Sequence, residues 1–283
     1  MKRAFRQIVI GQPTLRASLL VFGTIFLVGP ALTHELLAGP RSSGELAPSD
    51  FTLTSSDRSC HQGAIASQGR MVYLRNCQSC HGLCGQGNGV YAPTLRTKPR
   101  DFTTGVYKWR STPTGALPTD EDLMLTLSRG VLESGMPAFA GMPEKDRLAV
   151  IVYIKSLSPR FSNEPVERPL TIPPEPAMTI DSIKKGRQTY EQLGCAACHG
   201  ATGNGWGPLA PDLVDDDGHT IRPADLTAST WKGGCQGQDL YRSIMTGLDG
   251  SPMPAFETQL PPAEAWALVH YIQSLDQSRD WFH

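Results

Sequence analysis

The chain has 283 residues, of which 40% are apolar and 19% charged, and its formal net charge at pH 7 is −1. This composition is typical of folded domains rather than of a disordered chain, and the length allows two domains. After the N-terminal segment there is no run of lysine and arginine interleaved with aromatic residues, so nucleic acid is excluded as the expected partner.

The N-terminal segment, residues 1–34, has the features of a signal peptide or a membrane anchor. Four basic residues and no acidic one precede an uncharged run from Ala17 to Thr33. The run is slightly shorter than the ~20 residues of a membrane span, and small residues at Gly29 and Ala31 offer a cleavage site. A cleaved signal and a retained anchor both stay open. In either case we expect a periplasmic or other extracytoplasmic protein, soluble after cleavage or anchored by an N-terminal helix.

After a Ser/Gly/Pro-rich linker at residues 35–56, the sequence repeats itself. Four stretches recur at a spacing of 117 or 118 residues: NCQSCHG as GCAACHG, GRMVY as GRQTY, MPAF unchanged, and YIKSL as YIQSL. Such a period indicates two homologous domains, which we place at residues 57–160 and 181–283. Six prolines within residues 159–180 predict a semi-rigid proline-rich linker, residues 161–180, that divides the two domains.

Both domains are expected to be all-α, with the same order of elements. A helix of about residues 64–77, or 181–194 in the second copy, leads to a cysteine pair. A long Gly/Pro-rich loop, a short helix, the MPAF turn and a last helix follow, and no convincing alternating strand is present. The glycine of each GR pair should let the first and last helices cross closely, with Tyr153 and Tyr271 on the facing side.

The two C-x-x-C-H motifs indicate the chemistry of the chain. They are Cys77, Cys80 and His81 in the first domain, and Cys195, Cys198 and His199 in the second. Structural zinc needs four ligands, which one such motif does not supply, and a redox dithiol does not need the histidine. The motif is instead the attachment signal of c-type haem, in which the thiols form thioethers and the imidazole binds iron. We therefore expect two covalently attached haem c groups.

Met136 and Met253 are the candidates for the second axial ligand of each iron. They follow the motif histidines by 55 and 54 residues, and each precedes a proline in a turn before the last helix. A methionine thioether is a common haem ligand and raises the reduction potential. Met142 competes only in the first domain, because Gln259 is its counterpart in the second.

Four further residues are candidates to support the haems. Pro93 and Pro211 each stand twelve residues after a motif histidine, and we expect a backbone carbonyl there to accept a hydrogen bond from the imidazole Nδ1. Arg100 and Arg222 are candidates to pair with haem propionates. A plain loop role for the prolines and a solvated surface role for the arginines stay open.

In these features the chain resembles diheme members of the class I cytochrome c family. The attachment motif, the P-x-L step, the distal methionine and the helix pair all occur twice, over about 200 residues. The resemblance implies two tandem all-helical haem domains after the N-terminal segment. It also implies single-electron transfer from an exported respiratory dehydrogenase or reductase toward a terminal oxidase or another acceptor. The protein would then be no enzyme itself, but a carrier or a subunit of an oxidoreductase complex.

The alternative function is a diheme enzyme. A peroxidase needs a haem with an open position, which the paired methionines disfavour. A thiosulfate-oxidising enzyme uses a cysteine as a haem ligand, and Cys235 lies 18 residues ahead of Met253. The pairing of Cys235 with Cys60 or Cys84 also stays open, and a Cys60–Cys84 disulfide is one option in an oxidising compartment.

Overall fold

The structure is a computed structural model, and it describes residues 68–276, which belong to one compact unit of the chain. Within these residues the secondary structure is helical apart from two isolated β-bridges, which confirms the all-α prediction. No helix in the described part is long and apolar enough to cross a bilayer. The predicted signal or anchor at residues 1–34 and the linker at residues 35–56 lie outside the described residues.

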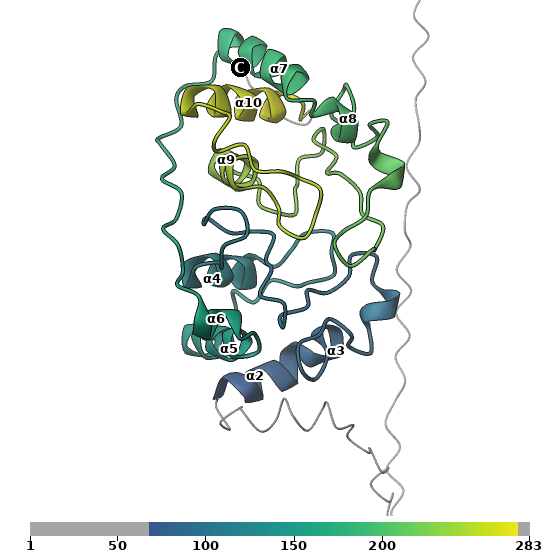
Figure 1. Cartoon of the computed structure of the whole chain (residues 1–283), viewed down its shortest axis with the longest axis vertical. Coiled ribbons are helices and arrows are strands. Elements are labelled where there is room, and N and C mark those ends of the chain that lie inside the picture. The colour runs from purple at the N-terminus through teal and green to yellow at the C-terminus, as the bar shows by residue number, and fades with distance from the viewer. Residues whose placement is uncertain (1–67, 277–283) are drawn as a thin grey trace, which may run out of the picture. The chain divides into compact units, whose positions relative to one another are not determined.

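The helices follow the same order in both halves of the described chain. The first half contains α2 (Gln68–Asn76), α3 (Gln78–His81), η1 (Ala92–Thr94), α4 (Asp120–Arg129), α5 (Glu144–Ser156) and α6 (Arg160–Asn163) (Figure 1). The second half contains α7 (Ile180–Gln192), α8 (Ala196–His199), η2 (Ala210–Asp212), α9 (Gly237–Thr246) and α10 (Pro262–Ser274). Only α6 has no counterpart, so the sequence repeat is a repeat of structure.

Local sequence signals explain where several helices begin. At the start of α4, Thr119 and Asp122 form a capping box, in which each side chain bonds the other residue's backbone N–H. Thr179 and Ser182 do the same at the start of α7. Helix α5 has no side-chain cap, but Glu144 in its first turn complements the positive end of the helix dipole.

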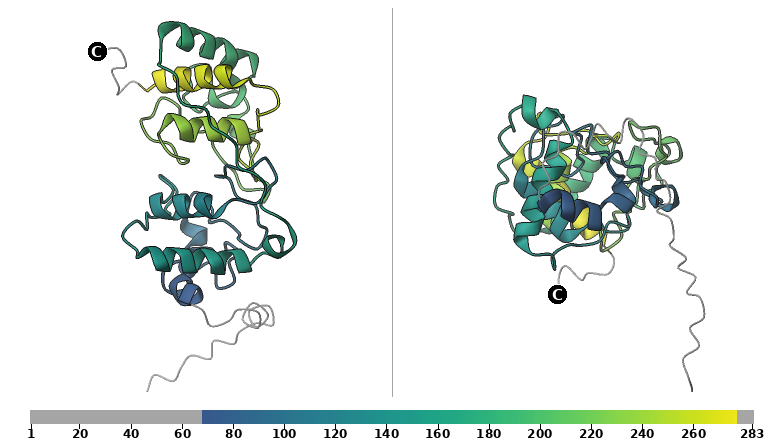
Figure 2. Two further views of the ribbon diagram at one scale, coloured as in Figure 1. Left: turned by 90° about the vertical axis from the view of Figure 1, so that its left-hand side faces the viewer. Right: turned by 90° about the horizontal axis from the view of Figure 1, so that it is seen from below.

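The first and last helices of each domain cross at a glycine. A Cβ atom on Gly69 would lie 2.0 Å from the carbonyl oxygen of Ala149, and one on Gly186 would lie 1.9 Å from that of Ala267. No side chain fits at such distances, so each crossing requires glycine. Figure 1 shows α7 alongside α10, and Figure 2 shows the same pair in green and yellow.

The tyrosines predicted for this crossing lie at it. The rings of Tyr73 and Tyr153 have centroids 5.1 Å apart, and those of Tyr190 and Tyr271 are 5.3 Å apart. All four side chains are buried. The predicted crossing of the first and last helices is therefore confirmed in both domains.

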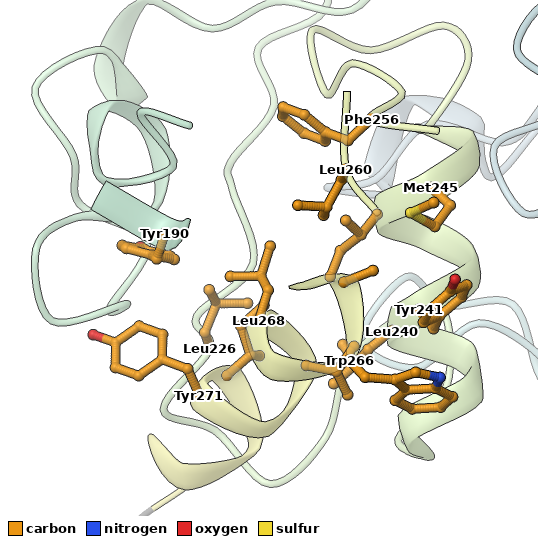
Figure 3. Packing of buried hydrophobic residues seen from close by; sticks show 14 of the residues in the cluster. Tyr190, Leu226, Leu240, Tyr241, Met245, Phe256, Leu260, Trp266, Leu268 and Tyr271 are labelled. Carbon is orange, nitrogen blue, oxygen red and sulfur yellow. The ribbon is translucent and has the colours of Figure 1, made fainter. Parts of the chain in front are cut away.

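Each domain has its own hydrophobic core. The first is built around Tyr73, Phe102 and the inner face of α5. The second includes the indole of Trp266, whose ring centroid lies 4.8 Å from that of Tyr241, and it extends along α9 and α10 (Figure 3). Two separate cores support two domains, while their predicted boundaries at residues 57–160 and 181–283 stay predictions.

The proline-rich segment between the domains is not a free spacer. The backbone N–H of Leu170 donates to the carbonyl oxygen of Ser111 in the first domain at 2.7 Å. Leu170 and Ile172 also pack against the core of the second domain. The predicted linker therefore contacts both domains at Leu170, and Ile172 adds a contact to the second.

The two domains also contact each other directly. Side-chain contacts between them include Arg110 to Asp249 at 2.8 Å, Arg129 to Asp239 at 3.0 Å, and Lys232 to Thr97 at 3.3 Å. The linker therefore does not isolate the two domains from each other, while its bounds at residues 161–180 stay a prediction. Contacts between repeats leave no local pattern in a single sequence.

Candidate functional site

Each C-x-x-C-H motif forms one tight helical turn. The backbone N–H of His81 donates to the carbonyl oxygen of Cys77 at 2.9 Å, and that of His199 donates to Cys195 at 2.9 Å. The two thiols and the imidazole of a motif stand at positions i, i+3 and i+4, which share one face of a helix. The turn thus gathers the three reactive side chains of each motif on one side.

The imidazole of each motif is held by a backbone carbonyl. Nδ1 of His81 lies 2.9 Å from the carbonyl oxygen of Arg100, and Nδ1 of His199 lies 3.0 Å from that of Ala224. A carbonyl only accepts, so Nδ1 carries the proton and donates. Nε2 is then the unprotonated nitrogen, and its lone pair is available to a metal.

These acceptors correct the prediction for Pro93 and Pro211. The two prolines lie in η1 and η2, where the chain folds back onto the motif turn. The chain that reaches the imidazole comes later, because the N–H of Phe102 bonds the carbonyl oxygen of Gly85 at 2.7 Å. RDFT at residues 100–103 resembles ADLT at residues 224–227, and this pairing places Arg100 opposite Ala224.

Burial disfavours charge on the histidine and on the first cysteine of each motif. Desolvation lowers the pKa of His81 and of His199, so both imidazoles stay uncharged at neutral pH. Burial also raises the pKa of the first cysteine thiol of each motif, to about 11 for Cys77 and for Cys195.

A tyrosine fastens each motif turn to the helix before it. The hydroxyl of Tyr73 donates to the carbonyl oxygen of Gly82 at 2.6 Å, and that of Tyr190 donates to Gly200 at 2.7 Å. Both hydroxyl bonds are buried. The helix crossing described above therefore also fixes the position of the motif histidine, one residue before each glycine.

Met136 and Met253 end matching turns. The N–H of Val131 donates to the carbonyl oxygen of Met136, and that of Leu248 donates to Met253, both at 3.1 Å. The methionine side chains are half-buried and pack against the core of their own domain. The turn geometry is thus the same for both predicted ligands.

The two predicted arginines occupy different surroundings. Arg100 contributes its main chain to the site, as the acceptor for His81. The guanidinium of Arg222 lies over the ring of Trp206, 4.3 Å from its centroid. Pairing of either arginine with a propionate stays a prediction.

The cysteines outside the motifs differ in state. Cys84 is disulfide-bonded, whereas Cys235 and the four motif cysteines are not. Its predicted partner, Cys60, lies outside the described residues.

Taken together, the donors fit a covalently bound haem c. Each motif offers two thiols outside disulfides and one neutral imidazole with Nε2 available, next to an apolar core. The same arrangement occurs twice.

Comparison with known families agrees with this geometry. The profile of the family described as "Cytochrome C oxidase, cbb3-type, subunit III" matches residues 64–154 and again residues 181–272. The chain belongs to this family. As a member of it, the protein is a c-type cytochrome with two tandem haem domains and two covalently bound haems c.

Curated relatives and a solved structure extend the family comparison. The chain is 29% identical over 213 residues to the cbb3-type cytochrome c oxidase subunit CcoP of Azospirillum brasilense, covering 73% of this chain and 61% of that protein. It is 26% identical over 229 residues to CcoP of Helicobacter pylori, covering 77% and 61%. The chain thus spans about three fifths of the length of these relatives.

One solved structure is more similar still. A chain of the Kuenenia stuttgartiensis reducing HAO-like protein complex is 40% identical, with a TM-score of 0.74, and the match covers 76% of this chain and 98% of that one.

Proposed function

We propose that each haem is held by the four residues that the repeat supplies for it. Cys77, Cys80, His81 and Met136 serve the first haem, and Cys195, Cys198, His199 and Met253 serve the second. The observation that carries this assignment is the pair of backbone carbonyls on the histidine Nδ1 atoms, at 2.9 and 3.0 Å. A histidine fixed in this tautomer is prepared to bind iron through Nε2.

The surrounding residues hold each motif turn and its histidine in place. When bound, haem supplies one-electron redox chemistry. The tyrosine hydroxyls hold the motif turns, and the carbonyls of Arg100 and Ala224 fix the imidazole rings. His81 with Met136, and His199 with Met253, would supply both protein ligands of each iron, which would suit a carrier and would leave no position open for a substrate.

The proposed place of the protein is between two redox proteins outside the cytoplasm. The named relatives are subunits of an oxidase, which supports a terminal oxidase or a similar enzyme as one partner. The basic flank and apolar run of residues 1–34 support export, either with cleavage or with retention as an anchor.

A second candidate partner is an HAO-like oxidoreductase. The chain covers 98% of the Kuenenia stuttgartiensis chain at 40% identity, against 61% of the Azospirillum brasilense oxidase subunit at 29%. The greater likeness over nearly the whole of that chain supports an HAO-like protein complex over an oxidase as the partner.

The ligand assignment is tested with Met253→Ala and Met136→Ala. Each variant should lose methionine ligation at one haem, so that the long-wavelength charge-transfer band of the oxidised protein falls by about half while both haems stay covalently bound. Retention of the full band in either variant would remove that methionine from the assignment. Purification of the native protein with its neighbours, followed by mass spectrometry, separates the oxidase from the HAO-like partner.

A further inference from the structure

The turn that ends in Met253 is tied to the other domain by one carboxylate. Asp249 lies inside this turn, directly after Leu248, whose N–H closes it onto Met253. Its Oδ1 accepts from Arg110 and from the hydroxyl of Thr114, both at 2.8 Å, and its Oδ2 accepts from the N–H of Gly115 at 2.8 Å. All three donors belong to the first domain.

The central donor is completely buried. The side chain of Arg110 has no exposed surface, and that of Asp249 is 14% exposed. Arg110 also donates to the carbonyl oxygen of Thr246, just before the turn, at 2.9 Å, and to that of Pro113 at 3.1 Å. The buried guanidinium of Arg110 restricts the turn that ends in Met253 to one geometry. If the turn moved, the charges of Arg110 and Asp249 would lose each other as partners.

The first domain has no equivalent of this contact. Leu132 occupies the position of Asp249 in the turn that ends in Met136, and its side chain is 45% exposed. Both turns share the same backbone closure, from Val131 and from Leu248. The carboxylate is therefore not needed to form the turn itself.

We infer that Asp249 is a positioning residue, through which the first domain holds Met253 on the iron of the second haem. This inference rests on the proposed ligation by Met253. The bond between a methionine sulfur and iron persists only while the chain holds the sulfur in place. At the second haem the three donors of the first domain supply part of that constraint, so ligation there depends on the contact between the domains.

The test uses the full haem-loaded chain in a Met136→Ala background, where the methionine charge-transfer band reports on the second haem alone. Added imidazole competes with Met253, and the loss of the band measures how firmly Met253 is held. Asp249→Asn keeps one acceptor atom but turns a donor toward the N–H of Gly115. It should increase the apparent affinity for imidazole about tenfold.

A second variant lies wholly in the other domain. Thr114→Val removes one exposed hydroxyl, does not threaten folding, and should increase the apparent imidazole affinity of the second haem about threefold. The matched control is Leu132→Ala in a Met253→Ala background, which should leave the imidazole affinity of the first haem unchanged.

The outcomes separate this inference from the ligand assignment. If the Met136→Ala background has no charge-transfer band, the ligation by Met253 is wrong. If the band is present and neither Asp249→Asn nor Thr114→Val changes the imidazole affinity, the positioning role is overturned. If Asp249→Asn does not fold, Thr114→Val alone decides. A threefold or larger effect from the first domain supports the role.

Discussion

In the first domain the ring of Phe102 stacks on the imidazole of His81, with centroids 4.4 Å apart and planes 19° from parallel. In the second domain Leu226 stands at the corresponding position of the repeat, so no aromatic side chain is available there to stack on His199. The carbonyl bonds to the two histidines differ by only 0.1 Å. The backbone carbonyl that orients the histidine is thus present in both domains. The side chain at the position of Phe102, which can affect the reduction potential, differs between them.

The last helices differ in a second way. Val152 on α5 is 67% exposed, whereas His270, at the same place on α10, is 1% exposed. Nδ1 of His270 lies 2.9 Å from the hydroxyl oxygen of Ser182, and Glu175 of the linker lies 3.8 Å from Nε2. The linker therefore covers the face of α10 that carries His270, whereas the matching face of α5 is exposed at Val152. The covered face of the second domain contains a titratable group, the imidazole of His270.

The largest expected effect is the loss of a haem from one domain only. Cys80→Ala should leave the first domain unable to mature, because one of its two thioether bonds cannot form. Cys198→Ala should do the same to the second domain. Mass spectrometry of each purified variant should show one covalent haem, and two haems in the parent protein. Two haems retained in either variant would contradict the attachment site, and loss of both would contradict independent maturation.

The helix crossings should be equally sensitive in the two domains. Gly69→Ala and Gly186→Ala each place a methyl group about 2 Å from a carbonyl oxygen, so each should lower the free energy of unfolding by about 3 kcal/mol. Urea unfolding followed by circular dichroism measures this. Gly141→Ala is the control, since nothing lies within 4 Å of a Cβ atom there. If only one crossing proved sensitive, the structural equivalence of the domains would fail at this point.

The buried histidine predicts a pH dependence for the second domain alone. Burial lowers the pKa of His270, and the charge of Glu175 offsets this only in part. Below the unfolded pKa of about 6.5 the unfolded chain binds a proton that the folded chain does not. Stability should therefore fall with decreasing pH, by up to about 1.4 kcal/mol per unit, until the folded pKa is reached.

Two exchanged variants check this dependence. His270→Val, which copies the first domain, should remove this part of the slope of unfolding free energy between about pH 7 and about pH 5. Val152→His should add no comparable slope, because the new imidazole would be exposed. An unchanged slope in His270→Val would show that the titration belongs to another group.

Much of this fold and site could be predicted from the sequence because its determinants are local or repeated. The C-x-x-C-H motifs, the helix-crossing glycines and the turns ending in Met136 and Met253 each occupy a few consecutive residues and occur twice. The helix caps and the all-α class follow from the same short-range patterns.

The features that the sequence does not predict are contacts between residues far apart in the chain. Arg100 and Ala224 act through backbone carbonyls, which no side-chain pattern marks, whereas Pro93 and Pro211 are conspicuous in both copies of the repeat. The ion pair of Arg110 and Asp249 spans 139 positions and exists in one copy only. A comparison of the two repeats identifies the residues that they share. It does not identify the residues, such as Arg110 and Asp249, that form contacts between the two domains.

The smallest expected effect concerns the aromatic stack on the first histidine. The face of a phenyl ring is electron-rich, so Phe102 should stabilise the more positive, oxidised state of the site through His81. Phe102→Leu, which copies the second domain, should raise the potential of the first haem by about 20–40 mV, from a cation–π energy of about 0.5–1 kcal/mol. Leu226→Phe should lower the potential of the second haem by a similar amount, provided that circular dichroism shows the larger side chain to be accommodated. Spectroelectrochemical titration resolves both shifts, and an opposite sign in Phe102→Leu would mean that the difference between the domains tunes something other than the histidine.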